Sequence, residues 1–266
     1  MSDIAPGIAL ATRGVNKRFG SLVVAADVEL SLPSGVRYAL IGPNGAGKTT
    51  LINLITGMMR PDSGRILLGG EDITALAPEA RVQRGLVRTF QINSLFPELT
   101  PLESVTLAVC ERTRAARTFW HQLTAYRREI DEAYEILCAL TLGPICHRPT
   151  RALAYGQQRL VEIALALATR PKVLLLDEPA AGVPREESKD LFAAISGLSR
   201  DITVLFIEHD MELVFRFASR VIVLVGGRVL LEGTPAEIAA DARVRAVYLG
   251  KGLDKGLAKA HGGAAA

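Results

Sequence analysis

The sequence contains no hydrophobic run long enough to cross a membrane. A membrane-spanning helix needs an apolar stretch of about 18 residues or more, and no such uncharged stretch occurs among the 266 residues. Residues 1–6 carry neither the basic cluster nor the apolar segment of a signal peptide. We therefore expect neither a membrane-spanning helix nor a cleaved leader.

Cysteine is scarce, and its spacing does not indicate a metal or redox site. Cys110, Cys138 and Cys146 are an odd number of cysteines and contain no C-x-x-C pattern. In a long chain this is typical of reduced thiols in a cytosolic protein. We expect no disulfide.

Neither sign of charge dominates the sequence. Lys and Arg number 31 and Asp and Glu 28, which gives a net charge of +3. A protein that binds nucleic acid along its whole length would carry a larger basic excess, so we expect no nucleic-acid partner. Hydrophobic residues make up 49% and charged residues 22%, a composition that excludes intrinsic disorder as the main state.

Short apolar runs alternate with helical stretches for most of the chain. Three runs are predicted to be buried strands, at residues 36–41, 172–177 and 202–207. Near the end, two apolar runs flank Gly226-Gly227, a pattern that predicts a hairpin. Buried strands separated by helices predict a mostly parallel sheet that is covered on both faces.

The middle of the chain differs, because residues from about 100 to 150 lack strand patterns and are rich in helix formers. We interpret this stretch as a helical insertion. It is basic through Arg112, Arg114, Arg117, Arg127 and Arg128. These arginines form either an ordinary solvated surface or a surface near anionic lipid headgroups, and the sequence leaves both alternatives open.

The most informative motif is GPNGAGKT at residues 42–49, which fits the pattern G-x-x-x-x-G-K-[ST]. It lies between the predicted strand 36–41 and a predicted helix at 48–57, which is the context that the motif requires. Glycines allow backbone N–H groups to surround a phosphate, and the helix N-terminus adds partial positive charge. In such a loop Lys48 neutralises the β- and γ-phosphates, and the Thr49 hydroxyl can ligate Mg²⁺. The predicted phosphate-binding residues are Gly42, Pro43, Asn44, Gly45, Ala46, Gly47, Lys48, Thr49 and Thr50.

Two carboxylates follow the second predicted strand. Asp177, beside a phosphate-binding strand, can hold Mg²⁺ through water. Glu178 can polarise an attacking water as a general base. An Asp-Glu pair after a strand is commonplace, and it is the phosphate-binding loop that favours the catalytic interpretation.

With these motifs in place, LAYGQQR at residues 153–159 resembles the signature motif of ATP-binding-cassette (ABC) ATPases, usually L-S-x-G-Q. The resemblance covers residues 8–250. It implies an α/β fold with a P-loop NTPase core and a mostly parallel sheet. It also implies an N-terminal antiparallel β region and an inserted α-helical subdomain at about 92–158. Residues 251–266, mostly Gly, Ala and Lys, are expected to form a disordered tail.

The resemblance adds further site residues. Phe19 matches the aromatic residue that stacks on adenine, and His209 in IEHD matches the switch histidine. Gln91 in RTFQ matches the Q-loop glutamine, which acts in catalysis and at the metal. From the signature motif, the residues implied to contact nucleotide are Ala154, Gly156 and Gln157.

Two positions depart from the family pattern. Ala154 replaces the usual signature serine, which removes one hydroxyl contact to the γ-phosphate. Val183-Pro184 stands where the D-loop commonly has Leu-Asp or Leu-Asn. Whether the two nucleotide sites communicate through that side chain is therefore left open by the sequence.

The resemblance also implies partners and a location. ABC ATPases act as two-chain sandwiches in which the P-loop of one chain faces the signature helix of the other, with ATP and Mg²⁺ between them. The predicted helix at 156–169 would offer its free N–H groups to a γ-phosphate. The chain has one copy of each motif, so a second ATPase subunit, identical or paralogous, is implied. Permease subunits, an extracytoplasmic solute-binding protein acting indirectly, and a peripheral position on the cytoplasmic face of the inner (plasma) membrane are implied as well.

Several strings narrow the resemblance to one subfamily. VRTFQ, LAYGQQR, DEPAAG and IEHD, with Gly-Thr-Pro after the hairpin and Tyr-Leu-Gly near the end, are similar to the ATPase subunits of branched-chain or hydrophobic amino acid uptake systems. Relatives for urea, short amides or aromatic acids share these strings. Non-transport ABC ATPases usually have two cassettes or a long coiled-coil insertion, and this chain has neither. The solute and the direction of transport are not determined by the sequence.

Overall fold

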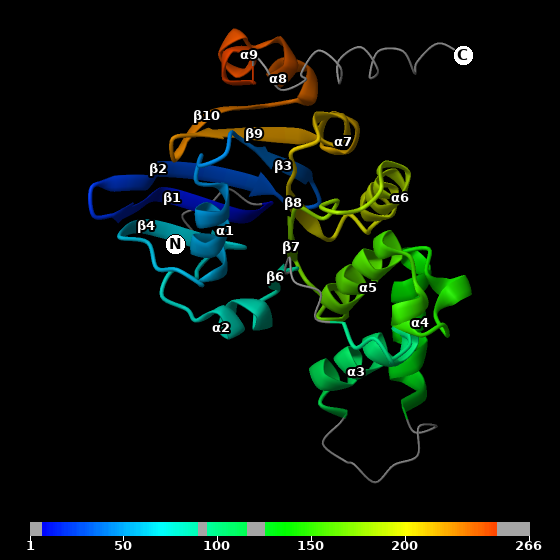
Figure 1. Ribbon diagram of the computed structural model, residues 1–266. Helices are drawn as coiled ribbons and strands as arrows, with labels where there is room; N and C mark the ends of the chain where they lie inside the picture. Colours follow the sequence, from blue (N-terminus) through cyan, green and yellow to red (C-terminus); the bar gives the residue numbers. More distant parts are fainter. Residues whose placement is uncertain (1–6, 90–94, 116–125, 249–266) are drawn as a thin grey trace. The chain divides into compact units, whose positions relative to one another are not determined.

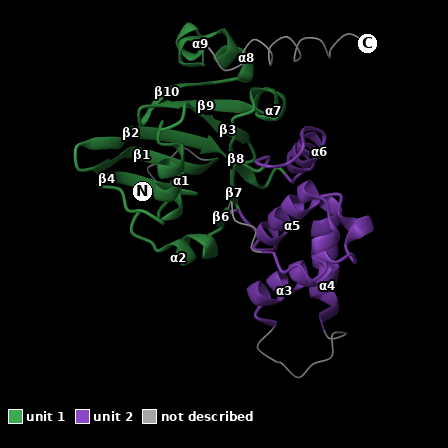
Figure 2. Cartoon of the chain, in the orientation of Figure 1, with its two compact units in different colours: residues 1–88, 172–179, 200–266 green, residues 89–171, 180–199 purple. Residues whose placement is uncertain are grey.

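The computed structural model describes residues 7–89, 95–115 and 126–248 (Figure 1). The predictions for Gln91, Arg117 and the tail at 251–266 lie outside these residues. The chain divides into two compact units (Figure 2). Unit 1 comprises residues 1–88, 172–179 and 200–266, and unit 2 comprises residues 89–171 and 180–199. The predicted boundaries of the cassette, 8–250, and of the helical subdomain, about 92–158, remain predictions.

Unit 1 contains a four-stranded antiparallel sheet with the strand order β2-β1-β4-β5. Its strands are β1 (Ile8–Phe19), β2 (Leu22–Pro33), β4 (Ser63–Leu68) and β5 (Glu71–Asp72). Along β2, Val28, Leu30 and Leu32 are buried and alternate with more exposed polar residues. This period of two is what a sheet with one face on a core requires.

Unit 1 also contains a six-stranded sheet with the order β10-β9-β3-β8-β7-β6. Its strands are β3 (Arg37–Ile41), β6 (Leu86–Arg88), β7 (Val173–Asp177), β8 (Thr203–Ile207), β9 (Arg220–Val225) and β10 (Arg228–Gly233). All neighbours are parallel except β9 and β10. Every residue of β3, β7 and β8 is buried, as expected for parallel strands covered on both faces.

The hairpin between β9 and β10 turns at Gly226 and Gly227, which have φ values of 55° and 76°. Two consecutive residues in the left-handed region match the tight turn that joins twisted antiparallel strands. The Gly227 N–H donates to the Ala46 carbonyl at 2.9 Å. The hairpin turn therefore supports the phosphate-binding loop.

The helices of unit 1 are α1 (Lys48–Thr56), α2 (Pro78–Gln83), α7 (Met211–Phe217), α8 (Pro235–Ala240) and α9 (Ala242–Tyr248). Helix α1 inserts Leu51, Ile52, Leu54 and Ile55 into a core shared with both sheets. Arg81 is 1% exposed and closes the far end of α1, donating to the Leu54 and Ile55 carbonyls at 2.9 and 2.6 Å. The helix that begins at the phosphate-binding loop is thus fixed along its length.

Unit 2 is helical in its described residues. Its helices are α3 (Pro101–Thr113), α4 (Arg127–Ala139), α5 (Tyr155–Ala168) and α6 (Arg185–Ser196), with 3-10 turns η3 (Gly143–Ile145) and η4 (Thr150–Ala152). Helix α3 begins with a capping box, in which Thr100 and Glu103 each satisfy the other's backbone N–H group. The predicted helical insertion is therefore confirmed.

One arginine of the basic stretch ties three of these helices together. Arg112 on α3 contacts Glu132 on α4 at 2.7 Å and donates to the Ala168 carbonyl at the end of α5 at 2.7 Å. Arg170 also pairs with Glu132, at 3.0 Å. Arg112 thus has an internal structural role.

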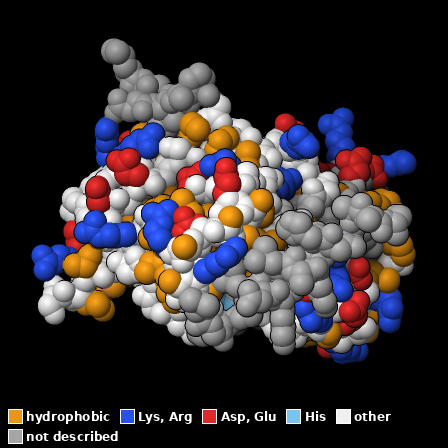
Figure 3. All heavy atoms as spheres, turned by 90° about the horizontal axis from the view of Figure 1, so that it is seen from above, with side chains coloured by type: hydrophobic (Ala, Val, Ile, Leu, Met, Phe, Trp, Pro, Cys, Tyr) orange, Lys and Arg blue, Asp and Glu red, His pale blue; other side chains and the backbone are white. Residues whose placement is uncertain are grey.

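The structure bears out the broad sequence predictions. The α/β fold, with an antiparallel N-terminal sheet, a mostly parallel sheet and a helical region, is confirmed. Cys110, Cys138 and Cys146 are free thiols. Within the part of the chain that the structure describes, no helix is long and apolar enough to span a bilayer. Figure 3 shows basic and acidic side chains interspersed on one face, in keeping with the net charge of +3.

Candidate functional site: a phosphate-binding cavity in unit 1

The loop at residues 42–47 joins β3 to α1 and forms the floor of a cavity. Gly47 has φ 99°, and a Cβ there would lie 2.5 Å from the Val24 carbonyl oxygen. Only glycine fits this position, because both its left-handed backbone and its close approach exclude a side chain. The loop is closed by a bond from the Ala46 N–H to the Pro43 carbonyl at 3.1 Å.

Helix α1 begins after Gly47, which has no side chain to cap the backbone N–H groups of the first turn. The first N–H groups of a helix have no partner within the helix, and together they attract anions. Lys48 lies beside them and is 7% exposed. Its ammonium group donates to the Gly42 and Pro43 carbonyls at 2.7 and 3.1 Å. The cation is therefore held inside the curve of the loop, where a phosphate would bind.

The cavity over the loop has a volume of about 420 Å³. Its lining consists of Leu22, Val24, residues 44–50, Glu178 and His209. Phe19, at the end of β1, is 50% exposed and does not line the cavity. The cavity brings the predicted phosphate-binding residues 44–50, but not Gly42 and Pro43, together with the predicted catalytic residues Glu178 and His209. The predicted stacking of Phe19 on adenine stays a prediction.

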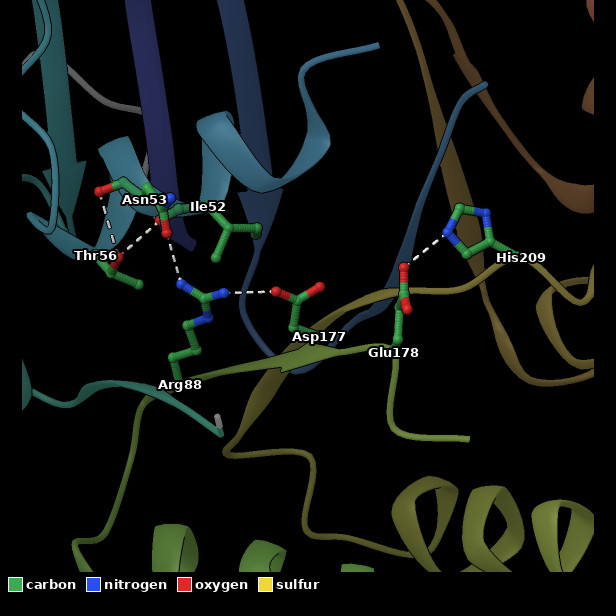
Figure 4. A network of polar contacts seen from close by, with 7 residues as sticks. All are labelled: Ile52, Asn53, Thr56, Arg88, Asp177, Glu178 and His209. Carbon is green, nitrogen blue, oxygen red and sulfur yellow. Dashed lines mark hydrogen bonds and ion pairs between the residues drawn. The ribbon is translucent and has the colours of Figure 1, made fainter. Parts of the chain in front are cut away.

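Glu178 and His209 meet because neighbouring parallel strands end side by side. Asp177 on β7 pairs with Ile207 on β8. Glu178 is the first residue after β7, and His209 is the second residue after β8. The Glu178 Oε1 and His209 Nε2 atoms are 2.7 Å apart (Figure 4). Glu178 has φ 49°, and its N–H donates to the Ile207 carbonyl at 3.1 Å. The carboxylate is therefore oriented by an imidazole at the wall of the cavity.

Asp177 is buried at the end of β7 and is held by an arginine. The Arg88 Nη2 atom lies 2.5 Å from Asp177 Oδ2, and the Arg88 Nη1 atom lies 2.7 Å from Asn53 Oδ1 (Figure 4). Sequence reasoning missed Arg88 and Asn53, because a lone arginine on a short strand and a lone asparagine on a helix carry no motif.

The end of α9 reaches the beginning of the phosphate-binding loop. Burial raises the pKa of Tyr248 to about 12, and the backbone of Gly42 lies close enough to its hydroxyl group to oppose that shift. Tyr248 belongs to the Tyr-Leu-Gly string that supported the subfamily resemblance. One residue of this string therefore lies beside the phosphate-binding loop. The sequence did not show this, because Tyr248 is far from the loop along the chain.

Unit 2 carries the signature residues. Ala154 precedes α5 and has no side-chain oxygen to cap the helix, and its N–H donates to the Gln157 side chain at 3.1 Å. The Gly156 N–H donates to Glu187 Oε2 on α6 at 2.9 Å. The backbone N–H of Gly156, which was predicted to contact a phosphate, is thus already hydrogen-bonded to a carboxylate. Sequence reasoning missed Glu187, which is 31 residues from its partner.

The predicted site residues are therefore distributed over the two units. Unit 1 contains the P-loop residues with Asp177, Glu178 and His209, and unit 2 contains Ala154, Gly156 and Gln157. Gln91 lies outside the described residues. Among the described residues, no group of three or more His, Cys, Asp or Glu side chains forms a metal site.

Comparison with known proteins identifies the family. The model for ABC transporters matches residues 25–181. The chain belongs to the ABC transporter ATP-binding family. It is therefore an ATP-binding cassette that hydrolyses ATP, as predicted. A second model, for branched-chain amino acid ATP-binding cassette transporters, matches residues 228–254.

Similar curated proteins place this cassette in a subfamily. The high-affinity branched-chain amino acid transport ATP-binding protein BraF of Pseudomonas aeruginosa is 40% identical over 91% of this chain and 98% of its own length. The protein LivG of Escherichia coli, which has the same description, is 38% identical over 91% of this chain and 98% of its own length. The cassette belongs to this branched-chain amino acid transport subfamily.

A solved structure supports the fold of the cassette. The crystal structure of the ADP conformation of an ATP-binding cassette of an ABC transporter matches with a TM-score of 0.78 and 32% identity. The match covers 92% of this chain and 99% of the other.

Proposed function

We propose that this cassette hydrolyses ATP to drive the import of branched-chain or other hydrophobic amino acids through separate permease subunits. The observation that carries the solute class is the agreement between near full-length relatives and the C-terminal model, all described by branched-chain amino acid transport. The family assignment supports ATP turnover, and the geometry of the cavity supports the residue roles below.

The cavity in unit 1 is proposed to hold the triphosphate of ATP. Lys48 and the first N–H groups of α1 would neutralise the phosphates in both the ground and transition states. A Mg²⁺ ion fits the oxygen donors Thr49 and Asp177, with Gln91 as a further ligand, and when bound it would neutralise charge on the phosphates. These are hard oxygen ligands of the kind that Mg²⁺ prefers.

Glu178 is proposed as the general base. Its carboxylate lies in the cavity wall and can accept a proton from a water that attacks the γ-phosphate. The 2.7 Å contact with His209 restricts the orientation of that carboxylate. His209 lines the same cavity, which supports the proposal that it also contacts the γ-phosphate.

Unit 2 is proposed to complete the nucleotide site of a second cassette. The chain carries one phosphate loop and one signature turn, so two subunits, identical or paralogous, would share two ATP molecules. The backbone N–H groups at the start of α5, around Gly156, would bind the partner's γ-phosphate in place of Glu187. The altered D-loop pair, Val183-Pro184, would lie near that contact.

The proposed setting is the cytoplasmic face of the inner (plasma) membrane, where the cassette binds its permease as a peripheral subunit. An extracytoplasmic solute-binding protein would deliver the amino acid and contact the cassette only indirectly. No nucleic acid takes part in this proposal.

Co-purification followed by transport tests the proposal. A tagged chain extracted from solubilised membranes should bring permease subunits with it, whereas a non-transport ABC ATPase would fractionate with ribosomes or DNA. The purified complex, reconstituted in vesicles with its binding protein, should import leucine, isoleucine or valine when ATP is supplied. Selective transport of urea, a short amide or an aromatic acid would assign the cassette to one of those relatives instead.

A further inference from the structure

The head of Arg88 connects the phosphate-binding helix to the end of β7. It donates to Asn53 on α1 through Nη1, at 2.7 Å, and to Asp177 through Nη2, at 2.5 Å (Figure 4). The side chains of Arg88 and Asp177 are 12% and 6% exposed. A pair this well removed from water is only weakly screened, and it is stable only where its geometry and its other hydrogen bonds are fixed.

The two partners of Arg88 are related to two of the proposed magnesium ligands, Thr49 and Asp177. Asn53 is four residues after Thr49 on α1, so both side chains lie on the same face of that helix. Asp177 is itself the second donor. One guanidinium group therefore spans the helix that carries Thr49 and the strand that carries Asp177.

We propose that Arg88 is a positioning residue that holds Asp177 in the orientation needed to bind the water shell of Mg²⁺. The inference rests on the proposed function, because it assumes that Thr49 and Asp177 act at a magnesium ion. Arg88 engages Oδ2 of the carboxylate, which would leave Oδ1 for the water ligands of a bound Mg²⁺ ion. Arginine suits this task because its planar fork can reach two acceptors at fixed angles, whereas the single ammonium of lysine cannot.

The opposite role would be a counter-ion that competes with the metal for Asp177. That role predicts that removing Arg88 strengthens magnesium binding. The contact with Asn53 favours positioning, because it anchors the guanidinium independently of the carboxylate and so fixes the carboxylate in turn.

Magnesium titration of ATP binding by the full chain tests the inference. Arg88→Ala should raise the Mg²⁺ concentration for half-saturation by about 10- to 100-fold, the usual effect of losing a group that orients a metal ligand. ATP affinity measured in EDTA should not change, since the P-loop contacts are intact. Arg88→Lys should recover part of the loss, and Asn53→Ala should shift the titration in the same direction by a smaller factor.

Arg84→Ala is the matched control. Arg84 forms an ion pair of similar length with Glu71, at 2.7 Å, but its side chain is 37% exposed. Arg84 does not line the cavity and has no proposed role in it. It should leave the magnesium titration unchanged. A fall in half-saturating Mg²⁺ for Arg88→Ala, or behaviour equal to that of Arg84→Ala, would overturn the inference.

Two further results separate the possible failures. Thermal unfolding without nucleotide shows whether a variant has lost its fold, and if Arg88→Ala does not fold, then Arg88→Lys and Asn53→Ala decide the matter. If the wild-type chain shows no Mg²⁺-dependent ATP binding, the proposed function fails. If the wild type binds and no variant shifts the titration, only the role of Arg88 is wrong.

Discussion

The two units offer different chemical groups to the proposed nucleotide sites. Unit 1 places ionisable side chains around its cavity, among them Lys48, Glu178 and His209. In unit 2 the predicted contacts at Ala154 and Gly156 have no ionisable side chain and can act only through backbone N–H groups. The contrast teaches that substitutions in unit 1 should change phosphate binding or the chemical step. Substitutions in unit 2 should change how well the backbone can approach a phosphate.

The sharpest test within unit 1 is Glu178→Gln. The amide keeps the shape of the carboxylate but cannot accept a proton, and loss of a general base costs about 10² to 10⁴ in rate. ATP affinity should be retained, so ATP-bound dimers should accumulate. Phosphate release by the assembled complex, with Glu186→Gln on α6 as control, measures the effect. Turnover near that of the wild type would show that Glu178 is not the base.

The corresponding test of unit 2 is Gly156→Asp. It adds a carboxylate beside Glu187 and a Cβ that would lie 2.8 Å from Glu187 Oε2. Hydrolysis should fall by about 10², comparable to losing preorganised N–H donors at a developing anion. ATP binding to the P-loop of the same chain should persist. Gly156→Ala separates shape from charge, and normal hydrolysis by Gly156→Asp in the complex would remove the signature turn from the site.

Lys48→Ala should reduce affinity as well as rate, in contrast to the two changes above. In the proposed site its ammonium would contact the phosphates before and during the reaction, and a hydrogen bond to a charged group contributes about 1.5–3 kcal/mol. That corresponds to a loss of about 10- to 100-fold in ATP affinity. Calorimetry on the purified chain measures it directly. Affinity equal to the wild type would mean that the backbone N–H groups bind phosphate unaided.

Ala154→Ser should have the smallest effect. It restores the hydroxyl that is usual at this position, but backbone N–H groups would still provide most of the contact and water can occupy the hydroxyl's place. We expect a modest stabilisation of the closed dimer, with ATPase activity within about threefold of the wild type. The measurement compares dimer formation in the presence of ATP by the Glu178→Gln variant and by the double variant that also carries Ala154→Ser. A much larger gain would show that unit 2 also depends on side-chain contacts.

Local patterns in the sequence predicted those parts of the site that lie close together along the chain. GPNGAGKT is contiguous, so its loop and the helix from Lys48 were predictable. The sequence also suggested Glu178, through the phosphate-binding loop, and His209, through the family resemblance. Their 2.7 Å contact, however, depends on the register of β7 against β8, which pairs Asp177 with Ile207.

Polar contacts between residues that are far apart in the sequence could not be predicted from local patterns. Arg88 and Asp177 are 89 residues apart, and Gly156 and Glu187 are 31 apart. Each contact joins a common residue type on one element to a common residue type on another. No periodicity or spacing encodes such a pair, since it forms only after the sheets and helices have packed. The position of Gln91 and the role of Phe19 stay predictions.

The backbone of Glu178 has a consequence for inactivation by heat. Its φ of 49° is in a region that costs a residue with a side chain about 1–2 kcal/mol, and such a conformation persists only where its surroundings enforce it. Here the Ile207 carbonyl and His209 enforce it, both at the end of β8. Loosening of that one strand end would let Glu178 relax while the buried sheet remains intact. On gradual warming, ATPase activity should therefore disappear before the circular dichroism of the fold changes.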